Sequence, residues 1–273
     1  MVANFSWFRH VIPPLAMRWL RQATGRAIRF SGDYSSWQEA LDNSLGYDLD
    51  AILNSVLDAT LRVKRGEAAY ERDSVVFHVM EYNWRLLAAL MWAAGVSNGK
   101  LSVLDYGGAL GSLYFQHKDI LSSLPALQWN IVEQSRFVEA GRKFVEDETV
   151  VFFDDLNVCL SDRSPNAVVM SGVLQYLEHP RQSLQDILST GSDIIFIDRI
   201  PFHEEASDRI TVQRVPSSIY PASYPSWIFC ESKFVAQCEE SWKVVSISDS
   251  FDGVMDAGRG DITFKSIILK SLS

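Results

Sequence analysis

The sequence predicts an α/β protein in which a doubly wound, mostly parallel sheet follows an N-terminal helical region. From about residue 100 onward, short apolar runs alternate with helical stretches, as in a parallel sheet covered by helices on both faces. Before residue 98, apolar residues recur at helical spacing instead. The last two apolar runs, 243–248 and 262–269, flank a short stretch rich in Gly and Asp, which predicts an antiparallel hairpin at the end of the sheet.

The N-terminal region, residues 1–98, is predicted to consist of a basic segment followed by a helical cap. Apolar residues between 49 and 61 repeat at helical spacing, and a second helix is expected over 74–94. The first 32 residues contain five arginines and neither Asp nor Glu. For residues 1–29 three alternatives stay open: a helix packed on the domain, which we favour, a helix lying on an anionic membrane surface, or a targeting segment.

Composition narrows the class of partner and of site. The chain has 273 residues and a formal net charge of −9, whereas nucleic-acid-binding proteins usually carry a basic footprint, so we expect no nucleic-acid partner. The three cysteines form no CxxC pair and the five histidines no HExxH motif, so neither a disulfide framework nor a metal site is predicted. Reduced thiols and the lack of a run of ~20 apolar residues predict a cytoplasmic protein, placed at the inner membrane face if residues 1–29 bind lipid.

Residues 99–273 are predicted to form the second and larger domain. Its parallel strands are expected at 102–105, 129–133, 150–153, 167–170 and 194–198. Helices are expected after the first, second and fourth of these strands, the last one over 181–189. Because ligands of such sheets bind outside the carboxyl ends of the strands, residues that follow the strands are the candidates for ligand binding.

The first candidate site is the glycine-rich turn DYGGALG at 105–111, which follows the first strand and opens a helix. Such a turn lets the backbone approach a ligand, and the next helix presents free N–H groups. It resembles the acidic-x-Gly-x-Gly-x-Gly pattern of S-adenosylmethionine-dependent methyltransferases, with an alanine in the middle glycine position. The residues expected to bind the cofactor here are Asp105, Gly107, Gly108 and Gly111. The dinucleotide fingerprint fits less well, because Tyr106 would occupy its first glycine, and a plain tight turn is the other alternative.

Three further cofactor contacts are expected at the ends of the next strands. Glu133 ends the second strand, where an acid can accept hydrogen bonds from both ribose hydroxyls of a nucleoside. Asp155 follows the third strand, where related enzymes often hold the adenine amino group, and Ser171 follows the fourth, near the methyl group. The alternatives are a solvent-exposed strand end for Glu133 and ordinary turn chemistry for Asp155.

The stretch from about 199 to 230 is predicted to be a substrate-facing insertion. It leaves the carboxyl end of the fifth strand and is longer than usual connections without showing a helical period. Its mixture of charged and aromatic residues suits a polar ring compound, although an ordinary covering loop is the alternative. The residues expected to bind the substrate are Arg199, Arg209, Tyr220 and Tyr224.

Methyl transfer needs the nucleophile, the methyl carbon and the sulfur in line, so positioning supplies much of the acceleration. A hydroxyl acceptor also benefits from a general base within hydrogen-bond reach. His203 is the first candidate for that base, because histidine titrates near neutral pH, and Tyr176 is the second. A packing role is the alternative for both.

Several segments together resemble a largely uncharacterised family of bacterial methyltransferases, whose members tend to be encoded among genes for surface polysaccharide synthesis. These segments are 30–40, 46–48, 70–74, 103–116, 171–180 and 219–229. The resemblance implies a Rossmann-like, seven-stranded class I methyltransferase fold, S-adenosylmethionine as cofactor, and a small polar acceptor such as a sugar. The alternatives are an NAD-dependent oxidoreductase and a non-catalytic cofactor-binding scaffold, held at the membrane by residues 1–29.

Overall fold

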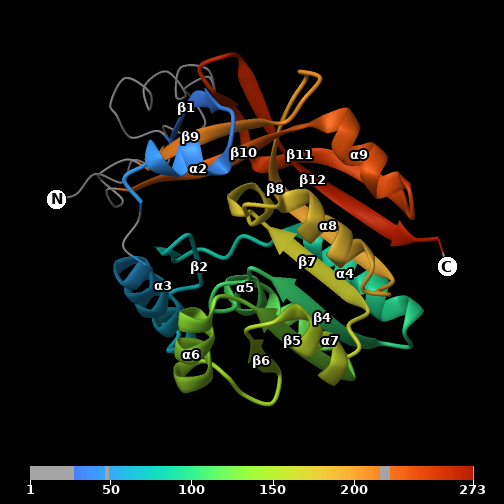
Figure 1. Ribbon diagram of the computed structural model, residues 1–273. Coiled ribbons are helices and arrows are strands. Elements are labelled where there is room, and N and C mark those ends of the chain that lie inside the picture. Colours follow the sequence, from blue (N-terminus) through green and yellow to red (C-terminus); the bar gives the residue numbers. More distant parts are fainter. Residues whose placement is uncertain (1–27, 47–48, 216–221, 273) are drawn as a thin grey trace, which may run out of the picture.

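The computed structural model describes residues 28–46, 49–215 and 222–272 (Figure 1). Tyr220 and nearly all of the basic segment 1–29 lie outside these ranges. Among the described residues, no helix combines the length and the apolar character needed to cross a membrane.

Seven strands form the central sheet. Their order across it is β6 (Val150–Phe153), β5 (Ala126–Val132), β4 (Lys100–Tyr106), β7 (Ala167–Ser171), β8 (Ile194–His203), β12 (Asp261–Ser271) and β11 (Trp242–Asp256). The first five strands pair in parallel. β12 runs antiparallel to β8, and β11 runs antiparallel to β12. The predicted Rossmann-like, mostly parallel sheet with a terminal antiparallel hairpin is confirmed.

Helices cover both faces of this sheet. Since neighbouring side chains of a strand point to opposite faces, they pack against different sets of helices. On β4, Val103 packs in the cluster that holds the apolar residues of α3, α4, α5 and α6, whereas Leu104 packs in the cluster that holds those of α7, α8 and α9. Strands buried on both faces explain why their sequence reads as continuous apolar runs. The helices are α3 (Leu49–Lys64), α4 (Trp84–Val96), α5 (Ser112–Leu121), α6 (Ser135–Phe144), α7 (Leu156–Asp162), α8 (Pro180–Leu188) and α9 (Glu231–Glu239).

Three more strands extend the sheet beyond the expected seven. β9 (Arg209–Val215) pairs antiparallel with both β1 (Arg29–Tyr34) and β10 (Ala222–Cys230). β10 joins the sheet through a parallel pairing with the last two residues of β8. A short helix, α2 (Trp37–Asp42), packs on this extension, which gathers at the end of the molecule opposite β6 (Figure 1). The stretch predicted as a substrate insertion is therefore largely strand, and part of the N-terminal region belongs to the same sheet.

One predicted helix was wrong in its first half. Residues 74–94 do not form one helix, because β3 (Val75–Phe77) pairs with β2 (Tyr70–Arg72) in a two-stranded hairpin. The β-branched and aromatic residues of β3 favour extended backbone, which competes with the helical spacing. α4 begins only at Trp84, where the Asn83 side chain accepts a hydrogen bond from the backbone of Leu86.

Candidate cofactor and acceptor site

The glycine turn lies where β4 ends and α5 begins. The Gly107 N–H donates to the carbonyl of Val132 at 2.9 Å, which ties the turn to the end of β5. Gly107 has a φ of +73°, and a Cβ there would lie 2.4 Å from the Val173 side chain. A Cβ on Gly108 would lie 2.4 Å from Cγ of Asp105. Both positions therefore need glycine, and the turn ends at Gly111, which is the N-cap of α5.

Asp105 lies beneath the turn and supports it. Its side chain is buried, and its Oδ2 accepts a hydrogen bond from Nε1 of Trp129 at 2.9 Å. Burial raises the pKa of Asp105 to about 7; the Trp129 hydrogen bond opposes this rise and the charge of Glu133 adds to it. The Asp105 side chain thus packs against the Gly108 backbone, and the ends of β4 and β5 lie together because Tyr106 pairs with Val132.

Glu133 directly follows β5 at the carboxyl edge of the sheet. Its N–H donates to the carbonyl of Phe153 at 3.0 Å, and its Oε2 accepts from the backbone N–H of Gln134 at 3.0 Å. The residue is half-buried, and burial raises the pKa of its carboxyl above the ordinary value. A carboxylate in this position can accept hydrogen bonds from a pair of hydroxyl groups, so the ribose contact stays a prediction.

Asp155 and Ser171 follow the neighbouring strands. Asp155 is exposed and caps α7, since its Oδ1 accepts a hydrogen bond from the backbone of Val158 at 2.9 Å. The alternative local role predicted for Asp155 is thus present in the form of a helix cap. A contact with the adenine amino group would have to use the same carboxylate. Ser171 ends β7 and is half-buried, and the next residue, Gly172, donates to the carbonyl of Asp198 at 2.9 Å.

A chain of polar side chains, which we call the polar wall, connects the segment after β7 with β9 and β10. The Tyr176 hydroxyl donates to Oε1 of Gln213 at 3.0 Å, and Nε2 of Gln213 donates to the Tyr224 hydroxyl at 3.2 Å. The two tyrosine rings meet edge to face with centroids 5.3 Å apart. Tyr176 is 37% exposed, but desolvation of its hydroxyl raises its pKa to about 12, so this phenol stays protonated at neutral pH and acts as a hydrogen-bond donor.

Gln213 lies in the predicted substrate-facing insertion, but it was not among the residues expected to bind the substrate. The signal that points to it is the period of two along β9, where the buried polar residues Arg209, Thr211 and Gln213 alternate with Ile210 and Val212. That signal becomes readable only when the segment is recognised as a strand.

His203 and Arg209 lie where β8 ends and β9 begins. His203 is the last residue of β8 and pairs with Cys230 of β10. Nδ1 of His203 and Nη1 of Arg209 each lie 3.8 Å from the same carboxylate oxygen of Glu205, and burial lowers the pKa of His203. The hydrogen bonds described for the polar wall do not include His203, which is five residues beyond Asp198 on β8.

Arg199 joins three segments that are distant in the sequence. Its guanidinium donates to both carboxylate oxygens of Asp73, at 3.0 and 2.7 Å, and to Oδ2 of Asp252 at 2.9 Å. It also lies 4.9 Å from the ring centroid of Phe251. Asp73 directly follows β2 and Asp252 lies in β11, and neither was among the residues expected to bind the cofactor or the substrate. To bind a substrate, the Arg199 guanidinium would have to give up hydrogen bonds to Asp73 or Asp252.

A second connection links the segment before α4 to α5 and β8. Nδ2 of Asn83 donates to Oδ2 of Asp198 at 3.1 Å, and the Asn83 N–H donates to Nε2 of His117 at 2.9 Å. The other ring nitrogen of His117 donates to the carbonyl of Leu113 at 2.8 Å, and burial lowers the pKa of His117 to about 4. His117 is therefore neutral and holds the N-terminal region against the sheet.

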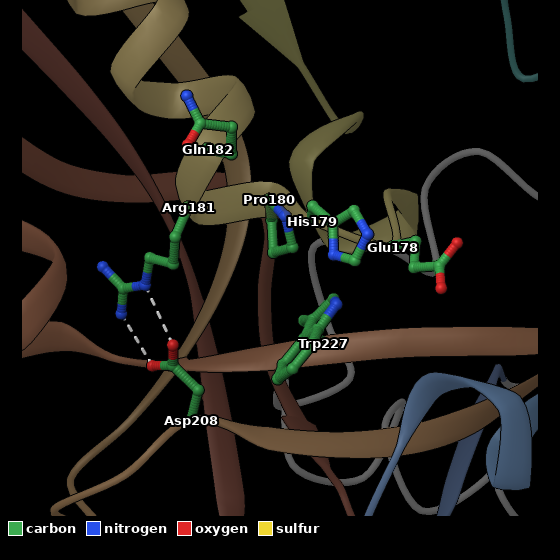
Figure 2. Close-up of a pocket in the computed structure, with 7 residues that line it drawn as sticks. All are labelled: Glu178, His179, Pro180, Arg181, Gln182, Asp208 and Trp227. Atoms are coloured by element: carbon green, nitrogen blue, oxygen red, sulfur yellow. Dashed lines mark hydrogen bonds and ion pairs between the residues drawn. The ribbon is translucent and has the colours of Figure 1, made fainter.

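A surface groove of about 530 Å³ lies at the start of α8 (Figure 2). It is lined by Glu178, His179, Pro180, Arg181, Gln182, Asp208 and Trp227. Figure 2 shows the guanidinium of Arg181 facing Asp208, to which it donates hydrogen bonds of 2.9 and 2.7 Å. Since Asp208 also accepts from the backbone of Cys230, these groups already satisfy one another. None of the predicted cofactor residues lines this groove, whereas Asp208 and Trp227 belong to the predicted substrate insertion.

Comparisons with known proteins give a likeness of fold. No family profile and no curated protein sequence matches the chain. Among solved structures, the N-terminal domain of EvdMO1 with SAH and D-fucose has a TM-score of 0.47 and 14% identity, and covers 83% of this chain and 98% of that one. The 1,6-didemethyltoxoflavin-N1-methyltransferase of Burkholderia thailandensis has a TM-score of 0.41 and 11% identity, with 89% and 93% covered. The magnesium protoporphyrin IX methyltransferase of Synechocystis PCC 6803 has a TM-score of 0.42 and 12% identity, with 69% and 82% covered. At these TM-scores the likeness carries no argument about ligand or activity.

Proposed function

We propose that the chain is an S-adenosylmethionine-dependent methyltransferase that acts on a small polar acceptor. The observation that carries this proposal is the position of the glycine turn in the strand order. The chain runs from β4 through β5 to β6 on one side and then returns to β7 and β8 on the other, so the order reverses between β4 and β7. Ligands of open α/β sheets bind at this switch point, outside the carboxyl ends of the strands. The glycine turn follows β4 at that point, and Glu133 follows the adjacent strand β5.

In this proposal the cofactor lies across the carboxyl ends of β4, β5 and β7. The turn backbone at Gly107, Gly108 and Gly111 contacts it, Asp105 positions that backbone, and Glu133 accepts hydrogen bonds from the ribose hydroxyls. Asp155 and Ser171 remain the proposed contacts of the adenine and the methyl end. The proposed ligand is a nucleoside with a cationic sulfur. When bound, this cofactor would supply the methyl group.

The polar wall is the proposed acceptor side of the site. Its tyrosine hydroxyls and its amide both donate and accept hydrogen bonds, which suits the hydroxyl groups of a sugar. A sugar of surface polysaccharide synthesis is the acceptor that the resemblance to the bacterial family favours. Arg199 and Arg209 remain proposed acceptor contacts, and His203 the proposed base. Tyr176 is better placed to orient the acceptor than to accept its proton, because its own proton is held to a high pH.

Replacing Glu133 by alanine is expected to weaken binding of S-adenosylmethionine and S-adenosylhomocysteine by roughly 10- to 100-fold, since hydrogen bonds to a charged group are lost. Isothermal titration calorimetry on the full chain measures this effect. Glu139→Ala is the matched control, because Glu139 is an exposed acid on the helix that follows. An unchanged affinity in the Glu133 variant would show that the ribose lies elsewhere.

The same titration separates the alternative functions. Binding of NAD with no binding of either sulfur compound at millimolar concentration would favour an oxidoreductase. Binding of the sulfur compounds without transfer of labelled methyl groups to a pool of nucleotide sugars would favour a non-catalytic scaffold. Transfer to a member of that pool identifies the acceptor directly.

Peripheral membrane contact through residues 1–29 is a separate proposal, supported by five arginines without a nearby acid in the first 32 residues. Deleting these residues is expected to reduce co-sedimentation with anionic vesicles relative to the full chain. Equal sedimentation of both proteins would count against membrane contact by this segment.

A further inference from the structure

A buried acid from the β2–β3 hairpin lies beside the glycine turn. Glu71, in the middle of β2, is only 2% exposed. Its Oε1 accepts a hydrogen bond from the Ser112 hydroxyl, and Ser112 is the first residue of α5, directly after the turn. Its Oε2 is buried and has no hydrogen-bond partner among the described residues. Glu71 therefore presents an unsatisfied acceptor at the point where the turn enters the helix.

Among the residues that the structure describes, no Lys, Arg or His side chain forms an ion pair with Glu71. Burial raises the pKa of Glu71 to about 7; Ser112 and the backbone of Ser74 favour its ionised form, whereas Asp73 disfavours it. The guanidinium of Arg72, the next residue, lies 3.7 Å from the ring centroid of Phe251. Arg199 is paired with Asp73 and Asp252. A buried carboxylate without a cation is costly, so a cationic ligand group is the partner that this position favours.

The shape of the cofactor indicates which of its groups reaches Glu71. The sulfur of S-adenosylmethionine carries three substituents: the adenosyl group, the methyl group and an aminocarboxypropyl arm. If Glu133 holds the ribose at the end of β5 and the methyl group points to the polar wall beyond β7, the third arm extends over the glycine turn of β4. Glu71 and Ser112 lie beside the end of that turn, and the arm carries a primary ammonium group.

We propose that the carboxylate of Glu71 binds the α-ammonium group of the methionine arm, with Ser112 fixing the orientation of the carboxylate. This inference rests on the proposed function. It assigns to the β2–β3 hairpin a direct part in holding the cofactor. It also predicts that the site discriminates against adenosyl thioethers that lack the amino-acid arm.

The test compares two ligands on two variants of the full chain by calorimetry. S-adenosylhomocysteine carries the ammonium group, whereas 5′-methylthioadenosine carries the same adenosyl thioether without the arm. Glu71→Gln keeps the size of the side chain and removes its charge. We expect it to weaken S-adenosylhomocysteine binding by roughly tenfold or more, as for a lost charge-assisted hydrogen bond, and to change methylthioadenosine binding by less than about twofold. Glu67→Gln is the control, since Glu67 is an exposed acid near the same hairpin that pairs with Arg65.

Equal weakening of both ligands by Glu71→Gln would overturn the proposal, because Glu71 would then only support the turn. A second comparison needs no variant: on the unaltered chain, S-adenosylhomocysteine is expected to bind roughly tenfold more tightly than its analogue with hydrogen in place of the amino group. Equal affinities would overturn the proposal even if the Glu71 variant did not fold. Failure of the unaltered chain to bind either adenosyl compound would instead overturn the proposed function on which the inference rests.

Discussion

Replacing Gly108 by alanine is expected to abolish measurable cofactor binding and to lower the free energy of unfolding by about 1–3 kcal/mol, as for other insertions of a methyl group into a packed region. The added Cβ would lie 2.4 Å from Cγ and 2.5 Å from Oδ2 of Asp105. Asp105 cannot easily move aside, because its carboxylate is buried and bonded to Trp129. The strain must therefore displace the turn itself, which is the backbone proposed to contact the cofactor. Urea unfolding and calorimetric titration measure the two effects.

Gly95→Ala provides a matched control for this substitution. Gly95 lies within α4, its φ is not in the left-handed region, and a Cβ there would meet nothing within 4 Å. Alanine is expected to stabilise this helix by up to about 1 kcal/mol and to leave cofactor binding unchanged. If the Gly108 variant bound the cofactor as tightly as the unaltered chain, Asp105 would not hold the turn rigidly in place.

Replacing Arg199 by methionine is expected to lower the free energy of unfolding by about 2–3 kcal/mol, because two carboxylates then face each other without a cation. The side chains of Arg199 and Asp252 are 20% and 13% exposed, so their pair is poorly screened by solvent. Asp73 is 63% exposed and contributes less. Cofactor affinity should fall as well, since the β2–β3 hairpin, which holds Glu71, loses a connection to the sheet.

Arg136→Met tests whether any lost ion pair has this effect. Arg136 pairs with Asp50 at the surface, where the two side chains are 59% and 68% exposed. This control is expected to change the free energy of unfolding by less than about 1 kcal/mol. Equal losses of unfolding free energy in the two variants would mean that the ion pairs of Arg199 contribute no more than an ordinary surface pair. A double variant, Arg199→Met with Asp252→Asn, should recover part of the stability by removing one unpaired charge.

The sequence predicts the central sheet and the cofactor side of the site because these depend on local patterns. Each core strand is a short apolar run bounded by turn residues, and the acid of Glu133 is the first residue after such a run. The glycine turn can likewise be predicted from the sequence, since its backbone geometry requires glycine at neighbouring positions such as Gly107 and Gly108. The ends of β4 and β5 meet as expected.

The acceptor side is less predictable because it depends on pairs that are distant in the sequence. Arg199 meets Asp73 across 126 positions, and Tyr176 meets Gln213 across 37. The pattern of residues within a single segment cannot predict such a contact. β9 and β10 were also missed as strands, because their alternation of polar and apolar residues stands out only once the pairing partner is known.

The pairing of β8 with β10 has a consequence for how the proposed site would select its acceptor. Through β8 the backbone hydrogen bonds of the central sheet continue into β10, by the pairings of Phe202 and His203. The position of β10, and with it Tyr224 of the polar wall, relative to the central sheet is therefore fixed by hydrogen-bonded backbone, which would limit the size of acceptor that the proposed site can take. Acceptors of different shape would have to be accommodated by exchanging wall side chains such as Gln213 and Tyr224, or by movement of the hairpin on the other side. Divergence of acceptor preference among proteins with this architecture should accordingly concentrate at alternate positions of β9 and β10.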